Sequence, residues 1–152
     1  MVKKSAGIVA YRTKNGFRVF LVHPGGPFFK NKDAGVWSIP KGEYAENEHP
    51  LLAAKREFTE ETGFELDGSF IELQPIKQKG GKTVCAWAIE FDLDETKIVS
   101  NTFEIEWPPK SGKIKAFPEI DKAGWFTVEE AKEKINPAQF KLIEELTEKS
   151  GL

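Results

Sequence analysis

The chain has 152 residues, of which 39% are hydrophobic and 30% are charged. This length fits one domain, residues 1–152, that can bury a core, and the composition excludes an intrinsically disordered protein. Because the net charge is only −2, there is no polycationic surface, and we expect no DNA binding. The one cysteine, Cys85, excludes an intrachain disulfide and a cysteine-rich zinc site.

The apolar run near the N-terminus is short and soon interrupted by charged residues, so it does not resemble a secretory signal peptide. No apolar run approaches the roughly 20 residues that a membrane-spanning helix needs. We therefore expect a cytoplasmic protein without a membrane partner.

Two β-rich segments, Ser5–Tyr11 and Arg18–Val22, flank an Asn15-Gly16 turn signal and predict a β-hairpin. A long segment rich in proline and glycine follows at 23–37, and long loops in compact domains often carry function. Within it, Phe28 and Phe29 suit either core packing or stacking on a substrate.

A short strand is predicted at Val36–Ile39, where Pro40 ends it. A helix is predicted at Pro50–Thr62, because proline suits a first helical turn and Gly63 suits the position after the last one. Its apolar stripe of Leu51, Ala54 and Phe58 predicts the face that packs on the core.

The second half of the chain predicts mostly strands, each bounded by turn signals: Ser69–Lys79, Thr83–Leu93, Thr102–Trp107, Lys113–Phe117 and Ala123–Phe126. A capping-box pattern at Thr127 predicts a helix, Asn136 and Pro137 end it, and a last amphipathic helix is predicted at Ala138–Lys149. Hairpins with one central and two terminal helices predict an α/β domain with a mixed sheet.

Three carboxylates, Glu57, Glu60 and Glu61, converge on one face of the central predicted helix, since residues three and four apart are neighbours there. They repel one another at neutral pH, and a divalent cation such as Mg²⁺, which prefers oxygen ligands, would relieve that repulsion. We predict Glu57 and Glu61 as the principal metal ligands. Glu60 is either a further ligand or the general base.

The stretch 42–64 reads G-x5-E-x7-R-E-Φ-x-E-E-x-G-Φ, where Φ is a bulky apolar residue. This pattern resembles the signature box of the Nudix hydrolases, which cleave a nucleoside diphosphate linked to another group. All fixed identities match, at Gly42, Glu48, Arg56, Glu57, Glu60, Glu61 and Gly63. The resemblance is highly specific, whereas a solvated acidic helix face would explain neither the glycines nor the distant glutamate.

The resemblance implies a Nudix-type α/β/α sandwich with a mixed sheet and a hydrolase that depends on Mg²⁺ or Mn²⁺. It also implies that the Gly42 carbonyl is a metal ligand, and that Arg56 pairs with Glu48 to hold the loop against the helix. The family often recruits a further glutamate as ligand or base. We prefer Glu119 to Glu104 and Glu106, which alternate with apolar residues like an ordinary strand.

Two lysines are predicted to bind phosphate. Lys41 lies next to the box and acts there either as a phosphate contact or as an exposed loop cation. Lys82, Trp87, Glu119 and Trp125 carry a weaker resemblance to the asymmetric diadenosine tetraphosphate hydrolases, which implies that Lys82 contacts a phosphate. Trp87 suits core packing and a substrate role about equally.

The second resemblance has departures, because Ala86 and Ala123 replace two tyrosines of those relatives. Stacking of an adenine would then pass to Phe28, Phe29 or Trp107. The predicted hairpin at 102–117 lies outside their pattern, and either covers the site or extends the sheet.

These observations predict a small-molecule nucleotide substrate, first of all a dinucleoside polyphosphate such as diadenosine tetraphosphate. The alternatives are a nucleoside triphosphate, a nucleotide sugar or a capped RNA, all with the same chemistry. A nucleotide sensor without catalysis is a third hypothesis, and the retention of every box carboxylate argues against it.

Overall fold

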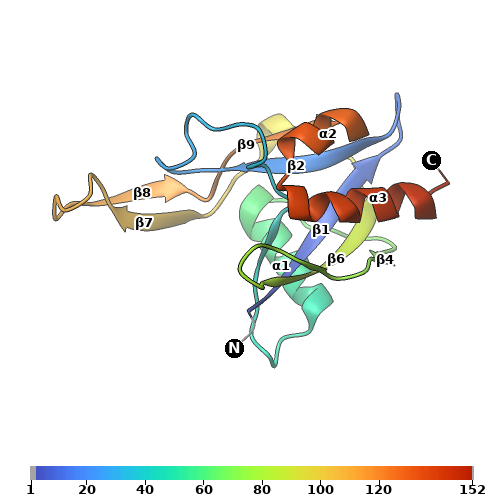
Figure 1. Cartoon of the computed structure of the whole chain (residues 1–152), viewed down its shortest axis with the longest axis horizontal. Coiled ribbons are helices and arrows are strands. Elements are labelled where there is room, and N and C mark those ends of the chain that lie inside the picture. The colour runs from blue at the N-terminus through green and yellow to red at the C-terminus, as the bar shows by residue number, and fades with distance from the viewer. Residues whose placement is uncertain (1–2, 152) are drawn as a thin grey trace.

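The computed structural model of the protein describes residues 3–151, which are organised around one mixed sheet (Figure 1). The strands run in the order β4-β6-β1-β2-β9, with β3 paired to β1 and β5 paired to β6. The pair β1–β6 is parallel and the other named pairs are antiparallel. Their bounds are Lys4–Arg12, Arg18–Pro24, Lys41–Glu43, Ile71–Glu72, Ile76–Lys77, Thr83–Glu90 and Ile120–Phe126 for β1 to β6 and β9.

The predicted hairpin is confirmed by β1 and β2, which are antiparallel neighbours. Their turn contains Asn15 and Gly16, both with positive φ, at 62° and 101°. Asparagine and glycine tolerate this left-handed backbone better than other residues, which is why the dipeptide marks the turn.

Helices cover both faces of the sheet. Neighbouring strand residues point to opposite sides, so the sheet has an apolar core on each face. Ile8 packs in the core beneath α1 (Pro50–Thr62), together with Phe58 of that helix. Val9 packs on the other side, with Ile143 of α3 (Phe140–Lys149). The predicted α/β/α sandwich with a mixed sheet is confirmed.

The central helix has the predicted bounds, and each end has a local cause. His49 accepts a hydrogen bond from Leu51 N (3.2 Å), and Pro50 occupies the first turn. Gly63 adopts φ 82° after the last turn and donates its N–H to Thr59 O (2.8 Å). Of the predicted apolar stripe, Ala54 and Phe58 are buried in the core, whereas Leu51 is only half-buried.

The prediction of a strand at Val36–Ile39 is wrong. Ser38 makes only an isolated bridge to Val22, and Trp37 makes another to Ile135. The Ile39 N–H then bonds to the Gln139 side chain (3.0 Å), so the backbone cannot continue a ladder. A strand lies after Pro40 instead, as β3.

Further boundaries differ from the predictions, since β6 ends at Glu90 instead of Leu93 and β9 begins at Ile120 instead of Ala123. The segment Ser69–Lys79 forms two short strands, β4 and β5, separated by a stretch that contains Pro75, which has no N–H to donate to a ladder. The last helix begins as a 3-10 turn, η2 (Pro137–Gln139), before α3.

The capping box at Thr127 is confirmed at the start of α2 (Val128–Lys134). A 3-10 turn, η1 (Glu95–Lys97), precedes a separate hairpin of β7 (Thr102–Glu106) and β8 (Ile114–Pro118), at the positions predicted. This hairpin does not join the main sheet and projects from the body of the molecule (Figure 1). Among residues 3–151, no helix is both long and apolar enough to cross a membrane.

Candidate active site

The backbone of β3 passes directly over the central helix. Gly42 lies opposite Ala6 of β1, whose side chain belongs to the core beneath α1. A Cβ atom at Gly42 would overlap the carboxylate of Glu57. Glycine is therefore required for the Glu57 side chain to reach the backbone of β3, and these two residues, each predicted as a metal ligand, lie side by side.

Glu61 is the most buried carboxylate near this contact, with only 7% of its surface exposed. Burial raises its pKa to about 8, and the negative charges of Glu57 and Glu119 act in the same direction. The opposing influences are the charge of Lys41 and a hydrogen bond from its backbone. Glu61 is thus held where a neighbouring positive charge would be strongly favoured.

Glu57 shares this environment. Burial raises its pKa, Glu60 adds to the rise, Arg56 opposes it, and Glu119 contributes a further increase. Glu57, Glu61 and Glu119 therefore influence one another electrostatically, although Glu119 comes from a distant part of the chain. The structure brings these three sequence-predicted residues into one region.

Arg56 connects the helix to the loop before it. Its Nε and Nη2 atoms donate to the two carboxylate oxygens of Glu48, at 2.8 and 3.1 Å. Its Nη1 atom donates to Glu57 (3.0 Å) and Glu60 (3.2 Å). These carboxylates, Glu48 first, raise the pKa of Arg56, and the predicted pair of Arg56 and Glu48 is confirmed as a bidentate contact.

Glu60 lies on the Arg56 side of the helix, and 40% of its side chain is exposed. In the part of the chain that the structure describes, no three acidic, histidine or cysteine side chains are gathered closely enough to hold a metal ion as they stand. Glu57 and Glu60 each accept a hydrogen bond from Arg56, whereas Glu61 lines a cavity to which neither of them contributes.

Glu119 is placed by backbone contacts among three segments. Its N–H donates to Asn101 O (2.9 Å), and its carbonyl accepts from Gly25 N (2.8 Å). Asn101 in turn donates its N–H to Glu60 O on the helix (2.8 Å). Glu119, Glu61 and Lys41 line a cavity of about 170 Å³ whose other walls are mostly apolar.

The other two candidate glutamates lie on the projecting hairpin, away from that cavity lining. Glu106 closes the hairpin turn by accepting the N–H groups of Lys110 and Gly112, both at 3.1 Å. Glu104 is exposed. The structure thus separates them from Glu119, as the preference for Glu119 required.

The two predicted phosphate-binding lysines lie near each other. Lys41 is half-buried, and burial followed by the positive charge of Lys82 lowers its pKa. Lys82 forms an ion pair with Glu43 (3.3 Å). Lys41 and Glu43 flank Gly42 on the strand, so their side chains lie on the opposite face of β3 from the Gly42–Glu57 contact.

The predicted aromatic residues lie in different surroundings. Trp87 is half-buried and packs against the core beneath α1. Phe28 is 60% exposed and lies edge-on to Trp107, with ring centroids 5.6 Å apart. Phe29 is half-buried, and Lys32 Nζ lies 5.7 Å from the centre of its ring.

Sequence reasoning missed Gln139, a fully buried amide behind the two lysines. Its Oε1 atom accepts from Ile39 N (3.0 Å), two residues before Lys41. Its Nε2 atom donates to Gln78 Oε1 (2.8 Å), and Gln78 N donates to Lys82 O (2.8 Å). One side chain thus braces both lysine segments, and the only signal in the sequence was a polar residue beside an apolar helix.

His23, at the end of β2, has a structural place in the fold. The ring is buried, with Nδ1 2.7 Å from Asp121 Oδ1 and Nε2 2.7 Å from Lys32 O. It therefore ties the loop after β2 to β9.

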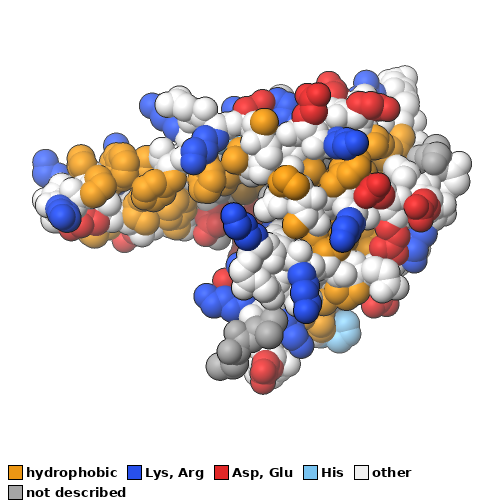
Figure 2. All heavy atoms as spheres, in the orientation of Figure 1, with side chains coloured by type: hydrophobic (Ala, Val, Ile, Leu, Met, Phe, Trp, Pro, Cys, Tyr) orange, Lys and Arg blue, Asp and Glu red, His pale blue; other side chains and the backbone are white. Residues whose placement is uncertain are grey.

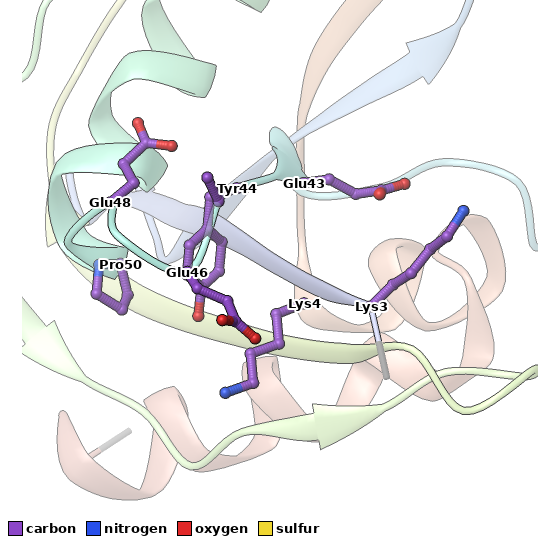
Figure 3. A pocket seen from close by; sticks show the side chains of 8 residues that line it. Lys3, Lys4, Glu43, Tyr44, Glu46, Glu48 and Pro50 are labelled. Atoms are coloured by element: carbon purple, nitrogen blue, oxygen red, sulfur yellow. The ribbon is translucent and has the colours of Figure 1, made fainter. Parts of the chain in front are cut away.

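A larger cavity of about 570 Å³ lies beside the loop between β3 and α1 (Figure 3). Its lining mixes lysines and glutamates around one aromatic ring, that of Tyr44. Glu48 contributes to the wall, but Glu57, Glu61 and Glu119 do not. The size of a cavity is therefore a poor guide to the carboxylate cluster in this protein.

The α/β/α sandwich with a carboxylate-rich helix laid across a mixed sheet agrees with the class of hydrolases that the signature box of residues 42–64 resembles. The chain belongs to the NUDIX family: the family model of the NUDIX domain matches residues 1–146. The predicted family and the predicted enzyme class, a Nudix hydrolase, are confirmed. A comparison with curated protein sequences finds no match.

Solved structures share the fold at low sequence identity. An Ap4A hydrolase from C. elegans in a binary complex is 20% identical, with a TM-score of 0.66 over 97% of this chain and 99% of that one. The NUDIX domain of NrtR from Shewanella oneidensis, in complex with ADP ribose, is 14% identical, with a TM-score of 0.68 over 99% and 89%. The E. coli ORF135 protein is 20% identical, with a TM-score of 0.59 over 97% and 89%.

Proposed function

We propose that this protein, as a single NUDIX domain over residues 1–152, hydrolyses a pyrophosphate linkage in dinucleoside polyphosphates such as diadenosine tetraphosphate, with a divalent metal. The observation that carries the proposal is the meeting of Glu61, Glu119 and Lys41 in the lining of one cavity, with Glu57 close enough to influence Glu61 electrostatically. Carboxylates that hold a cation, next to lysines that hold phosphates, are what a tetraphosphate chain requires.

The residues fit a Mg²⁺ or Mn²⁺ ion by their chemistry. Burial and mutual repulsion raise the pKa values of Glu57 and Glu61, and a bound cation would offset both effects. Glu57 and Glu61 would be the main ligands, with Glu60 and the Gly42 carbonyl as further oxygen donors. When bound, the ion would polarise phosphoryl oxygens and lower the pKa of a coordinated water.

The chain's own side chains supply the remaining functions. Lys41 and Lys82 would bind the bridging phosphates, and their partial burial strengthens that attraction. Glu119 would accept the proton of the attacking water, with Glu60 as the alternative base. Arg56 would act through its contacts, by holding the Glu48 loop and orienting Glu57.

Aromatic side chains would bind the adenine groups. Phe28 is the most exposed of the candidates, and Trp107 and Phe29 lie on or beside the same loop and hairpin. Trp87 is a weaker candidate because its ring packs on the core beneath α1. The Ap4A hydrolase of C. elegans, which has a similar fold, supports this choice of substrate.

The test is product analysis by chromatography after incubation with Mg²⁺ and diadenosine tetraphosphate, ATP, ADP-ribose or a nucleotide sugar. ADP-ribose is included because the similar Shewanella domain was crystallised with it. We expect ATP and AMP from diadenosine tetraphosphate and little turnover of the others. Turnover of another compound alone would contradict the proposed substrate and support the proposed type of reaction.

Matched variants complete this test. Glu61→Gln removes a buried carboxylate of the cluster, whereas Glu65→Gln makes the same change on an exposed residue just beyond the helix. If the wild type hydrolyses none of the four compounds, capped RNA is the next substrate to test. If it does not hydrolyse capped RNA either, the result favours a nucleotide sensor.

A further inference from the structure

The projecting hairpin, called the arm below, consists of β7, β8 and the turn between them, residues 102–118. Its register places Phe103 opposite Phe117 and Ile105 opposite Lys115, and Trp107 N bonds to Lys113 O (2.9 Å). These residues share one face, because alternate residues of a strand point to the same side. Figure 2 shows apolar side chains along the whole length of the arm.

The two faces of the arm differ in charge. Both carboxylates of β7, Glu104 and Glu106, lie on the opposite face from Trp107. The aromatic face carries Lys113 and Lys115, and Lys115 Nζ lies 5.6 Å from the ring centre of Phe117. One face of the arm is therefore aromatic and positively charged, which is the combination that binds a nucleobase and its phosphates.

The loop after β2 covers only part of this aromatic face. Gly26 packs so closely on it that a Cβ atom would meet the Phe103 ring. Two residues further on, Phe28 meets Trp107 edge-on, yet remains 60% exposed. Trp107 is half-buried, so Phe28 is the member of this aromatic pair that leaves most apolar surface in water, which a ligand would cover.

The arm begins and ends at the catalytic region. At one end, Asn101 bonds to Glu60 O, and at the other end Glu119 lines the small cavity. The five residues of β7, at about 3.3 Å each, separate this root from Trp107 by roughly 17 Å. A ligand that spans both places must carry several phosphates between the bond that is cut and its distal base.

We propose that Phe28 and Trp107 bind the distal nucleobase of a dinucleoside polyphosphate, while Lys113 and Lys115 attract its phosphate chain. The inference rests on the proposed function and assigns the second nucleoside to the arm. A second copy of the chain is a less favourable occupant. In a two-fold symmetric contact between two such faces, Lys113 and Lys115 of each copy would approach those of the other.

The test is calorimetric binding in the presence of Mg²⁺, with two methylene-bridged analogues that resist hydrolysis. One is a diadenosine tetraphosphate and the other is an ATP analogue, which lacks the distal nucleoside. We expect Phe28→Ala to weaken the first about tenfold, as the loss of one base–aromatic stack implies, and to leave the second unchanged. Phe28→Trp should restore the affinity.

Ile114→Ala is the matched control, because Ile114 is 65% exposed on the same arm but lies on the opposite face. It should change neither affinity. Equal weakening by Phe28→Ala and Ile114→Ala, or no weakening by either, would overturn the assignment. So would a dimer, measured by sedimentation, that dissociates in Phe28→Ala while the affinity stays the same.

Hydrolysis assays on the same samples separate the two proposals. Binding of the diadenosine analogue that depends on Phe28, without turnover of the natural compound, would support the arm and contradict the proposed reaction. Turnover of diadenosine tetraphosphate with affinities that Phe28→Ala leaves unchanged would support the reaction and contradict the arm.

Discussion

The C-terminal half of α1 and the arm are two charged regions that meet at Asn101 and Glu119, yet their surroundings are opposite. On the helix, Glu61 is 7% exposed, Glu57 faces Gly42, and Arg56 contacts three carboxylates. On the arm, Glu104 is exposed and Glu106 serves a turn. Glutamates are thus buried or closely packed on the helix, whereas those of the arm are exposed.

The difference in burial indicates which region can perform the reaction and which can select the ligand. A buried, braced carboxylate keeps its geometry and strengthens its electrostatic effect, which chemistry requires. An exposed aromatic face tolerates change and can adapt to the far end of a ligand. Substitutions in the helix should therefore reduce turnover, whereas substitutions in the arm should change which ligand is preferred.

The largest effect is expected for Glu61→Gln compared with Glu104→Gln. Removal of the buried charge should lower kcat on diadenosine tetraphosphate by about a hundredfold or more, since the loss of outer-shell partners of a metal site alone costs 10–100-fold. Glu104→Gln, on the exposed arm, should leave kcat unchanged. Equal rates for both variants in a steady-state assay would contradict the metal role of Glu61.

Arg56→Ala comes next, because it leaves Glu48, Glu57 and Glu60 without their shared partner. We expect a loss of roughly 1–2 kcal/mol in the free energy of unfolding, kept low because Arg56 is 39% exposed, together with a lower kcat. Chemical denaturation measures the first quantity. Arg56→Lys should recover little, since lysine cannot form the bidentate contact, and full recovery would contradict that geometry.

The stability of the metal-free protein should fall as the pH rises from about 5 to about 8. Because the folded-state pKa of Glu61 is raised from its ordinary 4.5 to about 8, the folded chain binds more protons than the unfolded chain in this range, and higher pH favours unfolding. Melting temperatures in EDTA at both pH values measure the effect. Mg²⁺ should reduce the loss at pH 8, and Glu61→Gln should flatten the profile.

A smaller effect is expected at Gln139, which touches neither the carboxylates nor the arm in the contacts described above. Gln139→Glu removes the N–H donor to Gln78, so it should destabilise the fold by about 1–3 kcal/mol. If the amide positions Lys41 and Lys82, the variant should also raise KM while kcat stays nearly constant. Gln139→Met, of similar length, is the control for volume, and an unchanged KM in both variants would leave Gln139 a purely structural residue.

Much of the fold could be predicted, because its signals are local. Prolines and glycines act within one turn, so a helix from about Pro50 to about Thr62 was predicted, and the Asn15-Gly16 turn located the first hairpin. The prediction of a strand at Val36–Ile39 was wrong because the contacts of this segment are not local. Its apolar residues suit a strand, but its hydrogen bonds go to distant partners, among them Gln139.

The sequence by itself determined the family and the spacing of the box carboxylates on one helix, since that spacing follows from helical geometry alone. Only the tertiary structure decided that Glu119 approaches Glu61 and that Lys82 approaches Lys41. These neighbours depend on backbone pairing between segments far apart in the chain. The projection of the arm was likewise a tertiary result, because the strand pattern does not say which sheet a hairpin joins.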